Sequence, residues 1–288
     1  MVAGLMDRWM VGDPLIQQSN LSWPSIMKNN INEVDMTLCR SAIYEALALG
    51  FRPPTTETCE RLIHDEQNSA LMQIAAMLDS SQSNDNSTNI AFRVRQLRQC
   101  AELEALEKLY RFLFGFTAHP KVPPYETEYG EETLFQQPQE LGDLAGFYNA
   151  FGLKVKASER VDHISCECEF LSFLARKEAY ALEQNDAGML EETRKAQRFF
   201  LKDHWGRFIP AFVKILKRED PEGFYGSLGN LCHEFTRFEC TRRNVPLGSE
   251  LMRLRPTEWM EEAFTCGSGE ELVQISRPSA SMLNVCET

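Results

Sequence analysis

The sequence predicts an all-α fold, a single-domain helical bundle of about eight or more helices around one core. Segment after segment places apolar residues three and four positions apart, the spacing of a helix with one buried face. No segment alternates apolar and polar residues between turn residues, as a half-buried strand would. The chain has 288 residues, of which 43% are hydrophobic, so it is long enough to bury a sizeable core.

The first half of the chain carries three apolar stripes with helical spacing. The first ends at Gly50, because the Pro53-Pro54 pair that follows cannot continue a helix. Its members are Ile31, Val34, Leu38, Ala42, Ala46 and Leu49. A polar loop at 80–89 separates the other two stripes. These are Leu71, Ile74 and Leu78, and then Leu103, Leu106, Tyr110 and Leu113.

The second half begins with a loop at 119–138 in which prolines bracket several acids, so we expect little regular structure there. A short helix over 141–153 follows, closed by Gly152 in a C′-like position. The clearest helical pattern runs from about 162 to 184. Its stripe and the three later ones are Ile164, Cys168, Leu171, Ala175, Ala179 and Leu182; Met189, Thr193, Ala196 and Phe200; Phe208, Phe212 and Ile215; and Leu228, Leu231, Phe235 and Phe238.

The domain organisation follows from this pattern. We expect an all-helical domain over 31–263, preceded by an N-terminal extension at 1–30 and followed by a flexible Gly/Ser-rich tail at 264–288. No apolar run approaches the length needed to cross a bilayer, and the N-terminal residues contain no apolar stretch long enough for secretion. The expected location is the cytoplasm, without membrane insertion.

Charge and motifs exclude several classes of function. The net charge is −12 and no basic face is apparent, so no nucleic-acid partner is expected. The nine cysteines are scattered and form no CxxC, which fits neither a disulfide framework nor a zinc ribbon. The sequence has no GxGxxG, Walker loop or GxSxG. The twin arginines of TRRN at 241–244 lie too deep in the chain for an export signal and are typical of a cationic helix C-terminus.

The segment ERVDHISCECEF at 159–170 combines acids, a histidine and two cysteines. Asp162 precedes the clearest periodic run, so we expect its carboxylate to cap that helix and His163 to be the first helical residue. Cys166 and Cys168 would point to nearly opposite helix faces and cannot share one metal. His163 and Glu167 are four positions apart and could face one ion, which leaves a metal site as an alternative.

Several segments occur in a characteristic order: YRFLFG at 110–115, PPYETEY at 123–129, AGFYNAFGL at 145–153 and DHISCECEFLSFLARKEA at 162–179. This ordered set resembles the NarJ/TorD/DmsD family of redox-enzyme maturation chaperones. The similarity covers roughly Val34 to Arg243. In detail it is most similar to the delta-type chaperones of ethylbenzene dehydrogenase, selenate reductase, chlorate reductase and dimethylsulfide dehydrogenase.

The resemblance implies a TorD-like fold, no catalysis and no cofactor of its own. Such a chaperone binds the twin-arginine signal peptide and the apo form of the catalytic subunit of a dimethylsulfoxide reductase superfamily enzyme. It holds this client in the cytoplasm until the molybdenum cofactor is inserted, and then releases it for Tat export. The positions that match the family's peptide site are Tyr110, Leu113, Phe114, Pro124, Tyr125, Glu126, Asp162 and His163.

The residues agree with such a partner. A twin-arginine peptide presents two cations and then an apolar stretch, so its receptor should combine carboxylates with apolar side chains. The available carboxylates are Glu126, Glu128, Glu131, Glu132 and Asp162. The available apolar side chains are Tyr110, Leu113, Phe114 and Tyr148. The chain departs from the family at Arg160, where members often carry proline.

Two other hypotheses stay open. A helical metalloenzyme would use His163, Glu167 and a carboxylate from another helix, and would purify with tightly bound metal. A permanent scaffold subunit would instead stay with the finished enzyme and would purify with it.

Overall fold

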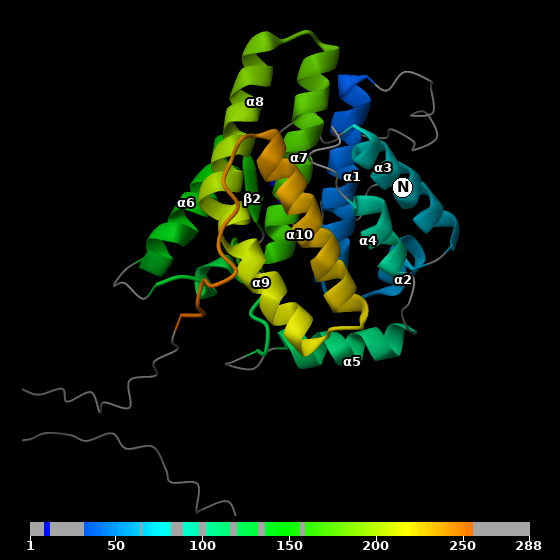
Figure 1. Cartoon of the computed structure of the whole chain (residues 1–288). Helices are drawn as coiled ribbons and strands as arrows, with labels where there is room; N and C mark the ends of the chain where they lie inside the picture. The colour runs from blue at the N-terminus through cyan, green and yellow to red at the C-terminus, as the bar shows by residue number, and fades with distance from the viewer. Residues whose placement is uncertain are drawn as a thin grey trace, which may run out of the picture. The chain divides into compact units, whose positions relative to one another are not determined.

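The computed structural model describes residues 9–11, 32–63, 65–81, 89–97, 102–115, 120–131, 136–155 and 159–255 (Figure 1). Within these ranges the all-α prediction is confirmed by helices α1 to α10. The chain divides into two compact units, Met1–Leu254 and Arg255–Thr288, and all these helices belong to the first. Outside the described residues lie the expected tail, most of the expected extension, residues 82–88 of the polar loop, Ile31 and Glu132.

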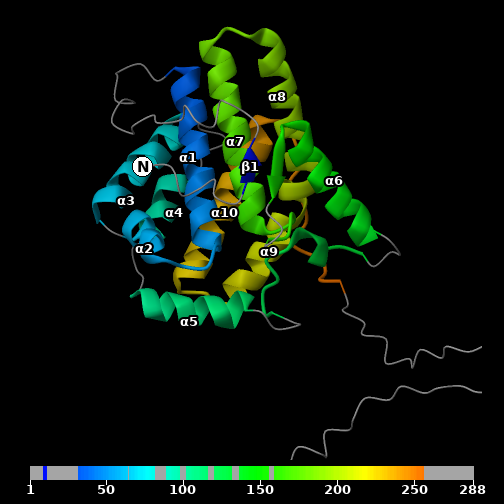
Figure 2. The ribbon, with the colours of Figure 1, turned by 180° about the vertical axis from the view of Figure 1, so that it is seen from behind.

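Two long helices, α1 (Glu33–Phe51) and α7 (Ile164–Glu183), pack along each other (Figures 1 and 2). The side chain of Asn32 caps α1, and α1 ends at Phe51, just before the two prolines. Both helices are buried on almost every face, because small and apolar residues surround their axes. Polar side chains of α7 therefore need partners inside the protein. Ser172, for example, lies 2.9 Å from Ser41 of α1, oxygen to oxygen.

The last three apolar stripes are confirmed by α8 (Ala187–Phe200), α9 (Gly206–Glu219) and α10 (Phe224–Arg242). Asp186 caps α8 with its carboxylate, and one π-helical turn, Leu201–Trp205, leads from α8 into α9. The carboxylate of Asp220 fixes the turn between α9 and α10, because it accepts from the amides of Tyr225 and Gly226 at 2.9 and 3.1 Å. Helices α9 and α10 then pack against each other.

The remaining helices are α2 (Thr56–Leu62), α3 (Asp65–Ser80), α4 (Ile90–Gln96), α5 (Leu103–Phe114) and α6 (Gln136–Ala150). The sequence predicts α3, α5 and α6 but not α2 and α4, whose 7 residues each are too few to show a periodic pattern. Helix α5 lies across the end of the bundle, below α9 and α10 in both views (Figures 1 and 2). There the rings of Tyr110 and Phe114 lie 6.0 and 5.2 Å from the ring of Tyr225 at the start of α10.

A short antiparallel strand pair joins distant segments, β1 (Trp9–Val11) and β2 (Leu153–Val155). Strands of 3 residues carry too little pattern to be predicted. Gly152, with φ of +71°, lies between α6 and β2 in the left-handed conformation that its predicted role requires. The described part of the predicted irregular loop at 119–138 contains a 3₁₀ turn, Glu126–Glu128, and the start of α6.

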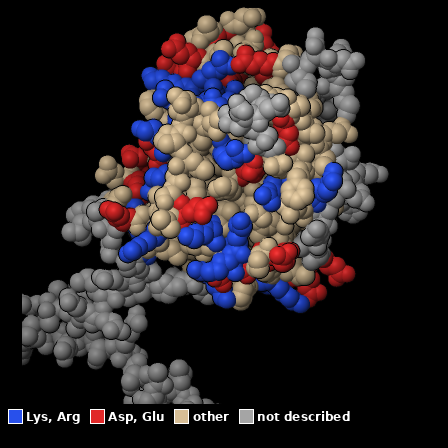
Figure 3. All heavy atoms as spheres, in the orientation of Figure 1, with Lys and Arg blue, Asp and Glu red and all other residues tan. Residues whose placement is uncertain are grey.

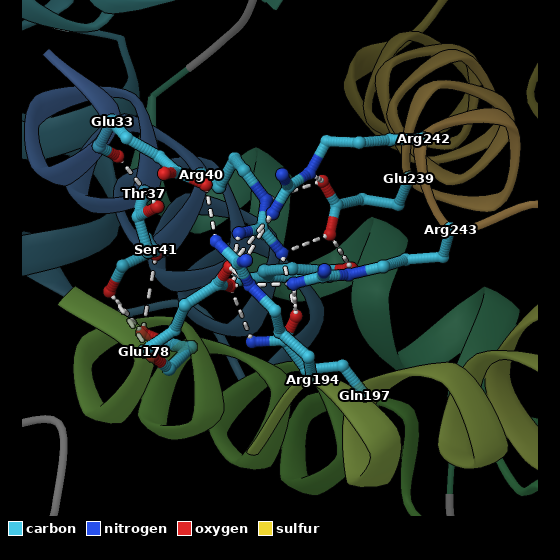
Figure 4. Close-up of polar contacts among 12 residues, drawn as sticks. Glu33, Thr37, Arg40, Ser41, Glu178, Arg194, Gln197, Glu239, Arg242 and Arg243 are labelled. Atoms are coloured by element: carbon cyan, nitrogen blue, oxygen red, sulfur yellow. Dashed lines mark hydrogen bonds and ion pairs between the residues drawn. The ribbon is translucent and has the colours of Figure 1, made fainter. Parts of the chain in front are cut away.

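A buried group of ion pairs joins α1, α7, α8 and α10 (Figure 4). The side chain of Arg40 is 2% exposed and donates to Glu178 at 2.7 Å and to Glu239 at 2.6 and 2.7 Å. Glu178 also accepts from Arg194 at 2.8 Å and from Arg243 at 2.7 Å. The TRRN segment ends α10, as predicted, but its arginines also bind this buried carboxylate. Arginines of α1, α8 and the C-terminal end of α10 thus converge on one carboxylate of α7.

Candidate functional site

The loop at 123–129 is bound to the start of α7 by backbone hydrogen bonds. Tyr125 and His163 form an antiparallel bridge. The amide of Glu126 donates to the carbonyl of Asp162 at 2.9 Å, and the amide of Ile164 donates to the carbonyl of Pro124 at 2.8 Å. Residues from the proline-rich loop and from the Asp-His pair, which were assigned to one site on sequence grounds, therefore lie side by side.

Tyr148 joins this group from α6. Its ring is buried, and its hydroxyl donates to the carbonyl of Val161 at 2.9 Å. The bond ties α6 to the segment just before α7. Tyr148 is therefore a buried support of the Asp-His segment in this structure, and its ring packs 4.8 Å from that of Phe170, centroid to centroid.

The cap of α7 differs from the prediction. His163, not Asp162, is the N-cap, because its Nδ1 accepts from the amide of Ser165 at 3.2 Å. The prediction that Asp162 caps the helix and that His163 is its first residue was wrong. The carboxylate of Asp162 is instead engaged by the hydroxyl of Thr127 at 2.7 Å and by the guanidinium of Arg160. These charge-assisted partners occupy the oxygens that a cap would use.

Asp162 forms the base of a site for a guanidinium group, which we call the Arg160 site: Tyr125, Thr127, Glu128 and Asp162. Arg160 donates from Nε to Oδ1 of Asp162 at 3.0 Å and from Nη2 to Oδ2 at 2.8 Å. Its guanidinium carbon lies 4.0 Å from the centre of the Tyr125 ring, and Nη1 lies 3.5 Å from a carboxylate oxygen of Glu128. The site thus combines two-point carboxylate binding with an aromatic face, the chemistry that selects a guanidinium.

Glu126 lies deeper and faces the protein interior. Its carboxylate is fully buried, accepts from Arg207 at 2.6 Å and lies 3.1 Å from Nδ1 of His204. Both partners come from the segment at the start of α9, about eighty residues further along the chain. In this structure Glu126 therefore joins the loop to α9, with its charge matched internally by Arg207.

Glu167 is a buried carboxyl one turn into α7. Neither of its oxygens has a hydrogen-bond partner among the described residues. Burial raises the pKa of Glu167 well above its usual value, and the nearby carboxylates of Glu126 and Asp162 raise it further. The raised pKa favours the neutral form of this side chain.

The aromatic residues of α5 form a second group. Tyr110, Leu113 and Phe114 are at most 7% exposed, and the ring of Phe114 lies 5.2 Å from Tyr225 and 6.5 Å from Phe212. The rings of Tyr110 and Phe114 thus pack against α10, and the ring of Phe114 also packs against Phe212 of α9, whereas the described partners of the Asp162 carboxylate are Thr127 and Arg160. The amide of Val122 donates to the carbonyl of Leu113 at 3.0 Å, so one short stretch of chain connects the two groups.

An exposed aromatic on α5 was not assigned to the site on sequence grounds. Phe112 is 54% exposed, and Nζ of Lys121 lies 3.9 Å from the centre of its ring. It occupies the helix face opposite to the buried stripe, where periodicity predicts a polar residue. Thr127, His204 and Arg207 were also missed, because a lone hydroxyl and two residues distant in sequence give no local signal.

On the face shown in Figure 3, Lys and Arg side chains are interspersed with Asp and Glu side chains. Glu131, another predicted carboxylate, is exposed. In the described ranges, no group of three or more His, Cys, Asp and Glu side chains is arranged to hold a metal ion. None of the described helices is long and apolar enough to span a bilayer.

Comparison with known proteins identifies relatives over much of the chain. Residues 67–214, just over half of the chain, match the family described as Nitrate reductase delta subunit. The perchlorate reductase assembly chaperone protein of Dechloromonas aromatica is 26% identical over 210 residues, which cover 71% of this chain and 90% of that protein. Chaperone protein TorD of Photobacterium profundum is 27% identical over 151 residues, 52% of this chain and 68% of that protein. The TorD of Vibrio cholerae is 28% identical over 144 residues, 49% and 62% of the two chains.

Proposed function

Because the chain belongs to the nitrate reductase delta subunit family, whose members are chaperones for redox enzymes and not catalysts, we propose that it matures one molybdenum enzyme in the cytoplasm. Its client is the catalytic subunit of an enzyme of the dimethylsulfoxide reductase superfamily. It binds the twin-arginine signal peptide and the apo subunit, and it holds them until the molybdenum cofactor is inserted. Release then allows Tat export.

The relatives support this class of client. One is named an assembly chaperone of perchlorate reductase, and two carry the name TorD. The first of them is matched over 90% of its length, so the similarity extends over nearly the whole of that chaperone. A reductase subunit with a molybdenum cofactor is therefore the client that we propose.

The observation that carries the proposal is the Arg160 site. A guanidinium already sits there, bound by two points to Asp162 and stacked on Tyr125. The same contacts would suit an arginine of a signal peptide, which is recognised by paired hydrogen bonds and by an aromatic face. Glu128 adds a second carboxylate to this site, which favours a peptide that brings more than one cation.

Calorimetry on the full chain tests the proposal. The ligand is the N-terminal peptide of the molybdenum subunit encoded nearest to this gene, and the control peptide has Ala-Ala in place of Arg-Arg. We expect binding that the control peptide lacks. Asp162→Asn should weaken it at least tenfold, because a neutral amide loses the charge-assisted pairing. Asp143→Ala, which removes an exposed aspartate of α6, should bind as the wild type does.

The result would be read together with thermal unfolding of each variant. If Asp162→Asn folds normally and binds the Arg-Arg peptide as tightly as the wild type, the peptide site lies elsewhere. If the wild type binds the Arg-Arg and Ala-Ala peptides equally, or binds neither of them, recognition of a twin-arginine signal is refuted for this chain.

A further inference from the structure

Arg160 is bound in the way that a ligand is bound. Three of its nitrogens make contacts: Nε and Nη2 with Asp162, Nη2 also with the hydroxyl of Thr127 at 3.0 Å, and Nη1 with Glu128 at 3.5 Å. Its planar face lies against Tyr125. The edge of the Arg160 guanidinium therefore binds carboxylates and its face stacks on an aromatic ring. These are the two kinds of contact by which proteins recognise an arginine side chain.

The residue that holds these contacts is nevertheless peripheral. Arg160 belongs to no helix or strand, and its side chain is 43% exposed. Arg40, by contrast, is 2% exposed and connects α1 to α7 and α10. The principal partner of Arg160 is only two residues away along the chain. Its side chain can therefore rotate outward without separating any two helices.

The carboxylate that Arg160 covers is fully buried. The carboxylate of Asp162 is 0% exposed, and its described partners are Arg160 and Thr127. An ionised carboxylate that loses its cation in such a place needs a replacement. The exchange of one guanidinium for another keeps every hydrogen bond, whereas loss of Arg160 without replacement does not.

The charges around Arg160 exceed what one arginine balances. Among the described residues, Asp162 and Glu128 each bring a carboxylate to the guanidinium of Arg160, which supplies one positive charge. These two carboxylates thus carry one more negative charge than Arg160 supplies. This excess suits a ligand that brings more than one cation, and a peptide with adjacent arginines is such a ligand.

We propose that Arg160 is an internal stand-in for the client's arginine: it occupies the Arg160 site in the free chaperone and is displaced when a client arginine binds to Asp162. The inference rests on the proposed function and adds a competitor that regulates binding of the client. The client must compete with a tethered guanidinium, so weakly matching cations such as lysine are excluded. If the open site is populated at about 10%, competition lowers the apparent affinity about tenfold.

Arg160→Gln opens the site, and Arg198→Gln is the matched control because it removes an exposed arginine of α8 with the same change in net charge. Binding of the twin-arginine peptide to each full-length variant is measured by calorimetry. We expect Arg160→Gln to bind about tenfold tighter than the wild type. Arg198→Gln should bind as the wild type does, apart from a small gain from net charge. The double variant Arg160→Gln/Asp162→Asn should lose the gain.

Each outcome decides the question. If the wild type binds the peptide through Asp162 but Arg160→Gln binds no tighter, the displacement is refuted and the proposed function stands. An equal increase in peptide affinity in Arg160→Gln and Arg198→Gln would show that the effect comes from net charge alone, and this would also refute the displacement. If no variant binds any peptide, the proposed function fails, and this inference fails with it.

A second measurement covers the case in which Arg160→Gln does not fold. In the wild-type chain, labelled at arginine nitrogens, the Nε–H signal of Arg160 is identified by its loss in Arg160→Lys. We expect this signal to move toward the position of a free, exposed arginine when the peptide is added. A signal that keeps its position at saturating peptide would overturn the proposal.

Discussion

Replacement of Glu178 by Gln removes the negative charge on which arginines of three helices converge. In the wild type this carboxylate is 0% exposed and lies within 2.8 Å of nitrogens of Arg40, Arg194 and Arg243 (Figure 4). Glutamine has the same shape and keeps one acceptor oxygen. The substitution therefore tests charge and leaves packing almost unchanged.

The expected loss of stability follows from burial. Removal of one partner of a buried ion pair costs about 3–5 kcal/mol, because the other charge stays buried without compensation. Arg40 keeps its bonds to Glu239, and Arg194 is partly exposed, so the low end of this range applies. We expect the free energy of unfolding to fall by about 3 kcal/mol. That is a large fraction of the roughly 5–15 kcal/mol that stabilises a typical domain.

Urea unfolding followed by circular dichroism measures the change. The midpoint should fall while the slope with denaturant stays constant, since the surface exposed on unfolding is the same. Glu192→Gln is the matched control on α8. Its carboxylate is 73% exposed and lies 3.8 Å from Lys195, so the expected change is within about 0.5 kcal/mol.

The pH dependence gives an independent check. Burial alone would raise the pKa of Glu178, but Arg40, Arg243 and Arg242 outweigh it and hold this pKa well below its usual value. The stabilisation is thus complete above the unfolded pKa, about 4.3, and is lost as the pH falls through the lower folded value. The difference between wild type and Glu178→Gln should shrink below about pH 4. A loss under about 1 kcal/mol at neutral pH would refute the reasoning, because it would mean that the arginines need no buried countercharge.

Further substitutions test two other buried residues, Glu167 of α7 and Phe114 of α5. Because the pKa of Glu167 is raised in the folded state, the wild type loses stability as the pH rises above the pKa of this side chain in the unfolded state. Glu167→Gln should remove that loss. Thermal melts at pH 5 and pH 8 should therefore show a higher melting temperature for the variant, with the larger difference at pH 8. Phe114→Ala should lower the unfolding free energy by about 3 kcal/mol, since its ring is buried, whereas Phe112→Ala on the exposed face should cost less than about 1 kcal/mol. Similar melting temperatures for these two alanine variants would contradict the core position of Phe114.

Long periodic helices were predictable from the sequence, and short elements were not. The stripe from Ile164 to Leu182 predicts α7 because twenty residues repeat the helical spacing several times. Helices α2 and α4 and the two strands are too short to repeat any spacing. Their formation depends on contacts with the rest of the fold.

The site was predictable in part. The resemblance placed the proline-rich loop and the Asp-His pair in one site, and the structure brings them together. The role of Asp162 was wrong because cap rules consider only the helix that follows. Here Arg160 on its N-terminal side, together with Thr127 from another loop, supplies stronger partners for the carboxylate. Tyr110 and Phe114 lie in a separate aromatic group, which residue type alone does not reveal.

The backbone bonds between the loop and α7 have a consequence for how the site moves. The carbonyl of Pro124 accepts from Ile164 in the first turn of α7, and the amide of Glu126 donates to Asp162 just before it. The loop therefore completes the end of a helix that is buried almost throughout. It cannot lift off as a hinged cover without leaving helix amides unpaired. The amide hydrogens of Glu126 and Ile164 should therefore exchange with solvent at one common, slow rate. Client recognition would then involve movement of side chains while the backbone of the site stays in place.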